Sequence, residues 1–239
     1  MPLLLEVIVS SVEDARAAEA GGADRLEIVR DLGAGGLTPP LDLVRAVAAG
    51  TSLPLRVMVR ENDGYELRDG ELDPLRRSAA DFAALGVDGI VVGFASAGEL
   101  RLDDVARVLD AAQSVRATFH RAFDSLRDPL GAIDRIAAMP QIDRIPTSGG
   151  TGTLPERAAR LAEYSERAAN RFTIIAGSDV DGDVLAVIAR TRCVREVHVG
   201  RAAREGGRRD APVSAERVRR LVTIGTADRA DEGGFRSNR

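Results

Sequence analysis

Short hydrophobic runs alternate along the whole chain with longer segments in which hydrophobic positions recur every three or four residues. The short runs are typical of buried parallel strands, and the longer segments of amphipathic helices. The pattern predicts strands over residues 3–9, 25–29, 55–59, 89–92, 115–120, 144–147, 173–176 and 196–199. It predicts helices over residues 11–20, 41–49, 72–85, 103–112, 129–139, 155–169, 183–190 and 214–222.

Eight strands that alternate with eight helices predict an α/β fold, a (β/α)₈ TIM barrel in one domain over residues 1–222. The length of 239 residues suits this fold, which typically needs about 250. An open doubly wound sheet is the alternative, but such sheets usually have about five or six strands. Residues 223–239 are polar and rich in Gly and Arg, and we predict a disordered C-terminal tail there.

The alternation of side chains along each strand indicates which ones face the barrel interior, because the outward face must be apolar to pack on helices. The interior then receives these side chains: Glu6, Arg25, Glu27, Arg56, Arg60, His120, Glu196 and His198. An unpaired buried charge costs several kcal/mol, so these groups must pair with one another or face the mouth. Arg25 and Arg56 begin their strands, and we expect structural ion pairs there.

Other polar residues fall at the ends of strands, where barrel enzymes place their active sites. These residues are Ser10, Arg60, His120, Arg121 and His198. His120 and His198 are the only two histidines of the chain, and imidazole titrates near neutral pH, so we predict that His120 acts as general base or acid with His198 or Glu27 as its partner. A structural role is the alternative. Asp124 can orient a ring, pair with Arg121 or cap a helix.

Loops rich in glycine follow several predicted strands and suit close approach to a ligand. They contain Gly33–Gly36, Ser148 with Gly149, Gly177, and Gly200. Because Arg60, Arg121 and Arg201 fall near the same rim, we predict a small anionic ligand bound by these arginines and loops.

Composition removes several classes of function. All 33 basic residues are arginine, so chemistry that needs a lysine amine is excluded, including Schiff-base aldolases, pyridoxal-phosphate enzymes and Walker-type phosphate loops. Cys193 is the only cysteine, which excludes an internal disulfide and any multi-cysteine metal site. A net charge of −4 argues against nucleic acid and anionic membranes as partners. No apolar run or leader is evident, so we expect a cytoplasmic protein.

Several motifs together resemble the copper homeostasis protein CutC family. They are Leu5-Glu6, the run 22–27 (GADRLE), the run 35–39 (GGLTP), Val59-Arg60, the run 86–89 (GVDG), the run 118–124 (TFHRAFD), the run 147–149 (TSG) and the run 196–198 (EVH). The run 118–124 is the most specific of them. The resemblance covers about residues 3–222 and implies a cytoplasmic TIM barrel, often a homo-oligomer, linked to copper tolerance. It also implies a shared pocket made of Glu6, Arg25, Glu27, Arg60, His120, Arg121, Asp124, Ser148 and His198.

The chain differs from the family that it resembles in the residues available to bind copper. Relatives often carry cysteines just after the first-strand glutamate, whereas Val7 and Ile8 follow Glu6 here. Copper(I) prefers thiolate or thioether ligands, and Met58 is the only such residue that we place inside the barrel.

Three hypotheses therefore stand. The chain binds copper, as the resemblance implies; it is an enzyme that acts on a small anionic or phosphorylated metabolite; or it is a scaffold with structural charges. In the enzyme, His120, His198, Glu27 and Asp124 carry the acid–base chemistry, and the arginines Arg60 and Arg121 hold the anion. In a variant of the enzyme hypothesis, another divalent metal such as zinc or manganese binds among Glu6, Glu27, His120 and His198.

Overall fold

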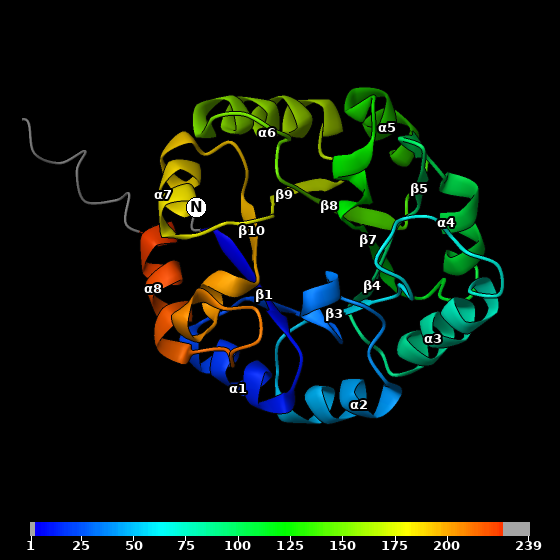
Figure 1. Cartoon of the computed structure of the whole chain (residues 1–239), viewed down its shortest axis with the longest axis horizontal. Helices are drawn as coiled ribbons and strands as arrows, with labels where there is room; N and C mark the ends of the chain where they lie inside the picture. Colours follow the sequence, from blue (N-terminus) through cyan, green and yellow to red (C-terminus); the bar gives the residue numbers. More distant parts are fainter. Residues whose placement is uncertain (1–2, 227–239) are drawn as a thin grey trace, which may run out of the picture.

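The computed structural model describes residues 3–226, and in this part of the chain eight parallel strands form a closed barrel inside a ring of eight helices (Figure 1). The barrel strands are β1 (Leu4–Val9), β2 (Arg25–Ile28), β3 (Leu55–Met58), β4 (Gly89–Val92), β7 (Arg116–Phe119), β8 (Ile142–Thr147), β9 (Thr173–Ala176) and β10 (Glu196–Val199). The helices are α1 (Val12–Gly21), α2 (Leu41–Gly50), α3 (Leu72–Ala84), α4 (Leu102–Leu109), α5 (Pro129–Ile136), α6 (Leu154–Ala168), α7 (Gly182–Thr191) and α8 (Ala215–Thr226).

The barrel closes where the last strand meets the first. Each barrel strand pairs in parallel with the next one along the chain, and β10 pairs with β1, with Leu5 opposite Val197. This confirms the predicted (β/α)₈ barrel over the open sheet. The structure adds a small hairpin after β4, formed by β5 (Ala95–Ser96) and β6 (Glu99–Leu100), which the sequence pattern did not predict. Strands of two residues are too short to produce a periodic signal.

The two faces of the strands pack as the alternation predicts. Outward side chains such as Val7, Val57 and Phe119 are fully buried in the layer between strands and helices. Inside the barrel, a separate apolar cluster contains Ile8, Val29, Met58 and Val91. Much of the remaining interior holds charged side chains such as Glu6, Arg25 and Arg56, whereas apolar side chains usually fill barrels of this fold.

Local sequence signals determine where several helices begin. Ser11 begins α1 by accepting a hydrogen bond from the Asp14 amide, and Asp128 caps α5 just before Pro129. Helix α8 ends at Thr226, so residues 223–226 are helical, in place of the predicted tail. Residues 227–239, the rest of that tail, lie outside the described residues. None of the described helices combines the length and the hydropathy needed to cross a membrane.

Candidate functional site

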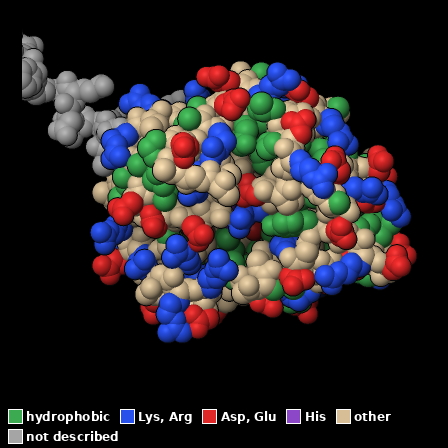
Figure 2. All heavy atoms as spheres, turned by 45° about the horizontal axis from the view of Figure 1, so that its top comes forward, with side chains coloured by type: hydrophobic (Ala, Val, Ile, Leu, Met, Phe, Trp, Pro, Cys, Tyr) green, Lys and Arg blue, Asp and Glu red, His purple; other side chains and the backbone are tan. Residues whose placement is uncertain are grey.

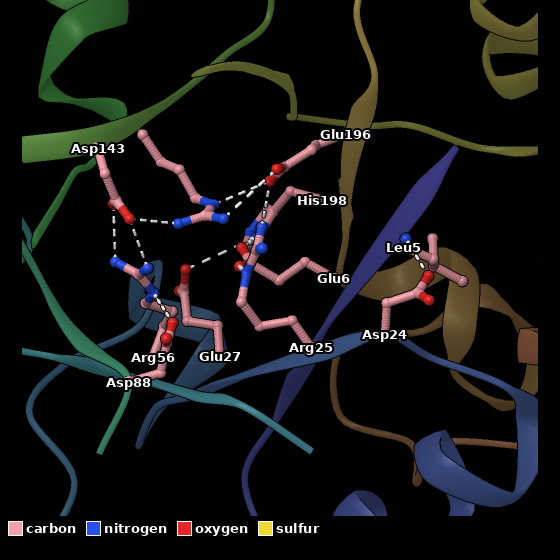
Figure 3. A network of polar contacts seen from close by, with 11 residues as sticks. Leu5, Glu6, Asp24, Arg25, Glu27, Arg56, Asp88, Asp143, Glu196 and His198 are labelled. Carbon is pink, nitrogen blue, oxygen red and sulfur yellow. Dashed lines mark hydrogen bonds and ion pairs between the residues drawn. The ribbon is translucent and has the colours of Figure 1, made fainter. Parts of the chain in front are cut away.

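The base of the barrel interior, where the strands begin, is filled by arginine–carboxylate pairs (Figure 3). Arg56 on β3 donates from Nε to Asp88 at 2.6 Å and from its two terminal nitrogens to Asp143 at 2.8 and 2.9 Å. Arg144 on β8 joins Asp143 to Glu196, and its Nε lies 3.0 Å from the Glu196 carboxylate. The ion-pair role predicted for Arg56 is confirmed, and the charges at this end neutralise one another.

Nearer the mouth, Glu6 connects this network to a histidine. Strand β1 lies between β2 and β10, and Glu6 is opposite Arg25 on one side and His198 on the other. Arg25 donates to one oxygen of Glu6 and to Glu196, the latter at 2.5 Å, as expected for a structural ion pair. The other oxygen of Glu6 lies 2.6 Å from Nδ1 of His198. Register alone therefore brings these three side chains together.

The protonation of this group follows from its contacts. Burial would raise the pKa of Glu6, but the Arg25 charge and the hydrogen bond with His198 hold this pKa well below its usual range. Glu6 is therefore ionised and accepts the Nδ1–H of His198. Burial would lower the pKa of His198, but the charge of Glu27 and the bond to Glu6 raise it. Among the described residues the Nε2 atom of His198 has no hydrogen-bond partner, so it can exchange a proton with a ligand.

Glu27 is the second carboxylate beside His198 and has a different environment. Its Oε2 lies 3.8 Å from Nδ1 of His198, beyond hydrogen-bond distance. Burial raises the pKa of Glu27 to about 7, with the charge of Glu6 adding to the rise and that of His198 opposing it. Two carboxylates next to one imidazole therefore differ in protonation, and Glu27 is the one that titrates near neutral pH.

His120 follows β7 and stands across the mouth as a neutral imidazole. Its Nδ1 accepts a hydrogen bond from the Ala122 amide at 3.1 Å, so the ring proton is on Nε2. Burial, followed by the nearby Arg60 charge, lowers the pKa of His120 to about 3. Gly93 makes room for the ring, because a Cβ at position 93 would lie only 2.8 Å from Nδ1. His120 can therefore donate a hydrogen bond without carrying a charge.

Arg60 lies beside His120 with its guanidinium bound to backbone carbonyls. It donates to the oxygens of Asp63 at 2.6 Å, Gly64 at 3.2 Å and Gly35 at 3.4 Å. The ring of Tyr65 lies 5.0 Å from the guanidinium carbon and 5.5 Å from the His120 ring centroid. Within residues 3–226, no carboxylate lies within ion-pair distance of Arg60, although the side chain is buried.

These groups surround a cavity of about 340 Å³ at the C-terminal end of the barrel strands. Its apolar wall includes Ile8, Leu32, Met58 and Val180. The cavity thus offers a ligand one apolar side and one side with titratable groups. On the outer face shown in Figure 2, acidic and arginine side chains intermingle, so charge of one sign does not dominate that face.

The structure brings most of the predicted site residues together. Those that line the cavity are Glu27, Arg60, His120, Arg121, His198 and Gly200. Glu6 and Arg25 lie behind His198 and act on it through the contacts above. Gly177 packs beside the same ring, since a Cβ there would lie 3.7 Å from His198. The metal candidates are narrowed to Glu6, Glu27 and His198, whose potential ligand atoms lie within 4.8 Å of one another.

Of the roles predicted for Asp124, the pair with Arg121 is confirmed and the contact with a histidine ring is not seen within residues 3–226, and the role predicted for the loop after β8 is corrected. Asp124 binds Arg121 Nε at 3.2 Å, the Thr147 hydroxyl at 2.6 Å and the Ser148 amide at 3.1 Å. The Gly149 amide donates to the Thr147 hydroxyl. These amides are used inside the loop and are therefore not offered to an anion, and Asp124 joins two loops, without a hydrogen bond to either histidine among the described residues.

Ser10 is likewise a structural residue. Its hydroxyl donates to Asp14 at 3.0 Å and lies 3.5 Å from a terminal nitrogen of Arg204. The Asp14 carboxylate also accepts from the Val213 amide and pairs with Arg204. Ser10 therefore belongs to a polar cluster that fastens the loop before α8, and it is not among the residues that line the cavity.

Sequence reasoning missed Tyr65 and Gly93. Tyr65 lies in the long loop between β3 and α3, where no periodicity marks a position. The one available signal is rarity, since the chain has only two tyrosines. Gly93 directly follows β4, and nothing local distinguishes it from a glycine of an ordinary turn. Both act through contacts with residues that are distant in the sequence, since Tyr65 and Gly93 each lie against His120.

Comparison with known proteins agrees with this architecture. A chain from Caulobacter vibrioides (strain NA1000 / CB15N), described as a family protein CutC, is 36% identical over 200 residues, covering 82% of this chain and 80% of that one. One from Rhizobium meliloti (strain 1021), with the same description, is 37% identical over 197 residues, covering 81% and 79%.

Two solved structures share the fold. A protein of Streptococcus agalactiae, described as a candidate copper homeostasis protein CutC, matches with a TM-score of 0.74 at 22% identity, over 82% of this chain and 97% of its own. A thiamine phosphate pyrophosphorylase of Pyrococcus furiosus matches with a TM-score of 0.55 at 16% identity, over 93% and 96%. At these identities the two structures establish the fold alone.

The fold and the cavity define a single-domain (β/α)₈ barrel protein with a polar, titratable mouth. The family model described as the CutC family matches residues 3–203. The chain belongs to the CutC family, which confirms the resemblance drawn from its motifs.

Proposed function

We propose that this protein is an enzyme that binds a small anionic metabolite in the mouth cavity and moves a proton on it. The observation that carries the proposal is the pair Glu27 and His198, two titratable groups on one cavity with Glu6 fixing the imidazole. A carboxylate with a pKa of about 7 is suited to accept a proton at neutral pH. Groups whose environments push their pKa values apart are typical of acid–base sites.

The contacts suggest a role for each side chain. Glu27 takes a proton from the substrate, and His198 returns one through Nε2 while Glu6 holds its Nδ1–H. His120, neutral and protonated on Nε2, donates to the oxygen on which negative charge develops. The guanidinium groups of Arg60 and Arg121 attract the anionic part of the substrate. Such reactions include isomerisation and elimination next to a carbonyl group.

Copper fits this donor set poorly. The description of the streptococcal protein refers to copper homeostasis. Copper(I) prefers sulfur ligands, and among the cavity-lining residues Met58 is the one that carries sulfur. Cys193 is half-buried just before β10, at the start of the strand and so at the opposite end of the barrel from the mouth. We therefore derive no step through copper.

A divalent metal at Glu6, Glu27 and His198 is also disfavoured by the contacts. Arg25 occupies one oxygen of Glu6, and His198 Nδ1 occupies the other. A metal ion on Glu6 would have to displace at least one of these partners from a buried carboxylate, and loss of the Arg25 contact would leave Arg25 with Glu196 alone. These contacts instead support proton transfer, during which Glu6 and His198 keep their hydrogen bond.

Turnover of a metabolite extract tests the proposal. Wild-type protein and Glu27→Gln are incubated with the small-molecule fraction of a bacterial lysate, and changes are followed by mass spectrometry and by proton NMR in D₂O. We expect the wild type to convert or deuterate a small anion, and Glu27→Gln to do so at least about a hundredfold more slowly. Glu163→Gln, at an exposed position of α6, is the matched control and should keep the wild-type rate.

The pH dependence separates this role of Glu27 from a passive one. The wild-type rate should rise with pH as Glu27 loses its proton near its pKa of about 7. Equal rates for the wild type and Glu27→Gln would contradict the proposal, and so would an extract that stays unchanged over this pH range.

A further inference from the structure

The buried arginines of the barrel differ in whether a carboxylate balances their charge. The residues Arg25, Arg56, Arg60 and Arg204 are all less than a tenth exposed, at 2%, 1%, 8% and 2%. Arg25 pairs with Glu6, Arg56 with Asp143 and Arg204 with Asp14. Over residues 3–226, Arg60 is the exception, with only carbonyl partners. A buried cation that faces a cavity without a counter-charge indicates a place for an anion.

The hydrogen bonds of Arg60 indicate which kind of anion fits. A guanidinium has five N–H donors. Three are used, from Nε to Gly64, from Nη1 to Gly35 and from Nη2 to Asp63. One N–H therefore remains on each terminal nitrogen. Two donors on neighbouring nitrogens match the two oxygens of a carboxylate, which binds them in a bidentate manner.

The surrounding charges favour a single negative charge. Glu6 is balanced by Arg25 and His198, while Glu27 faces the same cavity as a second carboxylate. Among the other arginines that line the cavity, Arg121 pairs with Asp124, Arg201 pairs with Asp179, and Arg209 is exposed. A dianion such as phosphate would place additional negative charge near Glu27. Tyr65 lies under the guanidinium and favours one orientation of its plane, which suits a planar partner.

We propose that Arg60 is the receptor for the carboxylate of a small monocarboxylic acid, held by the two free N–H groups of its terminal nitrogens. This inference rests on the proposed function and deepens it by naming the substrate class. His120 lies on the same cavity beside Tyr65, so an oxygen on the carbon next to that carboxylate has a hydrogen-bond donor available. Small 2-hydroxy and 2-oxo acids have this arrangement.

Calorimetric titration of the wild-type full chain tests the ligand class without any mutation. The probes are acetate and lactate, their neutral analogues acetamide and lactamide, and inorganic phosphate, all at one ionic strength. The carboxylates should bind about ten- to a hundredfold more tightly than the amides, the range expected for a charge-assisted hydrogen-bonded pair. Phosphate should bind more weakly than lactate.

Variants of Arg60 test the receptor itself. Arg60→Gln should weaken lactate binding by about ten- to a hundredfold. Arg60→Lys keeps the charge but loses the planar pair of donors, and should weaken binding by about tenfold. Arg45→Gln is the matched control, because Arg45 lies on α2, pairs with Asp42 and is not among the residues that line the cavity, and its effect should stay below about twofold. Circular dichroism establishes that each variant folds.

The outcomes separate this inference from the proposed function. Equal binding of lactate and lactamide, tighter binding of phosphate, no binding of either carboxylate, or unchanged binding in a folded Arg60→Gln would each overturn the carboxylate receptor. A preference for phosphate would still leave a small-anion enzyme. Arg60-dependent carboxylate binding with no turnover in the extract experiment would support the receptor and contradict the proton transfer. If Arg60→Gln does not fold, the wild-type probes decide alone.

Discussion

Arg56 and Arg60 are four residues apart, both point into the barrel, and their environments are opposite. Arg56 makes three hydrogen bonds to the carboxylates of Asp88 and Asp143 at the base. Arg60 makes three hydrogen bonds to backbone carbonyls at the mouth. One guanidinium has its charge cancelled by the protein, and the other does not.

The difference shows how one barrel separates stability from binding. At the base, each arginine lies against an acidic partner, so the network has no remaining capacity for a ligand. At the mouth, Arg60 has no ion-paired carboxylate and the Glu27 side chain has no hydrogen-bond partner among residues 3–226, and both face the same cavity. Burial of such unpaired groups lowers the stability of the free protein, and a ligand that pairs with them offsets this loss when it binds.

The largest expected effect comes from breaking the base. Arg56→Met leaves Asp88 and Asp143 without their shared cation and should lower the free energy of unfolding by about 2–4 kcal/mol, since both carboxylates are partly exposed. Arg60→Met should cost less than about half as much, because it removes bonds to carbonyls only. Urea unfolding followed by circular dichroism at pH 7 measures both. Equal losses would contradict the distinction drawn between base and mouth.

Ionisation of buried Glu27 should lower the free energy of unfolding at high pH. Its pKa is about 7 in the folded chain against an ordinary value of 4.5, so the unfolded chain releases the proton first as the pH rises. The contribution of Glu27 to the stability of the wild type is therefore fully present below pH 4.5 and is lost as the pH rises through 7. Relative to the wild type, Glu27→Gln should gain about 1–3 kcal/mol between pH 4.5 and pH 8.

Thermal or urea unfolding at several pH values measures this gain. Glu163→Gln, exposed on α6, provides the control and should keep a constant difference from the wild type. A difference between Glu27→Gln and the wild type that does not change with pH would show that Glu27 is not the strained group of the cavity.

The smallest effect concerns the space behind His120. In Gly93→Ala, the new Cβ would lie 2.8 Å from Nδ1 of His120, so the ring must shift away from the Ala122 amide. The loss of stability should be about 1–2 kcal/mol. NMR titration of the imidazole should show a pKa above the wild-type value of about 3, because the shifted ring becomes more hydrated. An unchanged titration would mean that the ring stays in place.

Periodicity predicts the parts of this molecule that repeat. Hydrophobic alternation located β1, β2 and β3 to within about a residue and gave the correct inward face, because outward side chains must pack on helices. The same rule selected Glu27, His120 and His198 before any contact was known.

The hydrogen-bond partners of individual groups could not be predicted from the sequence in the same way. The amides of Ser148 and Gly149 looked available for an anion, yet Asp124 and Thr147 bind them. Asp124 follows a different strand, β7, and Thr147 lies next to the loop itself. The local sequence does not show which of these groups binds the amides. The cytoplasmic location, the homo-oligomeric state and the exclusion of nucleic acid stay predictions.

The bond between Glu6 and His198 joins residues that are 192 positions apart, on the first and last strands of the barrel. During synthesis, Glu6 and Arg25 leave the ribosome long before their partner on β10 exists. The catalytic geometry that we propose thus forms only at ring closure, the step with the largest sequence separation and entropy cost. Nascent or truncated chains that lack β10 would be inert, and acquisition of activity would report the completion of folding.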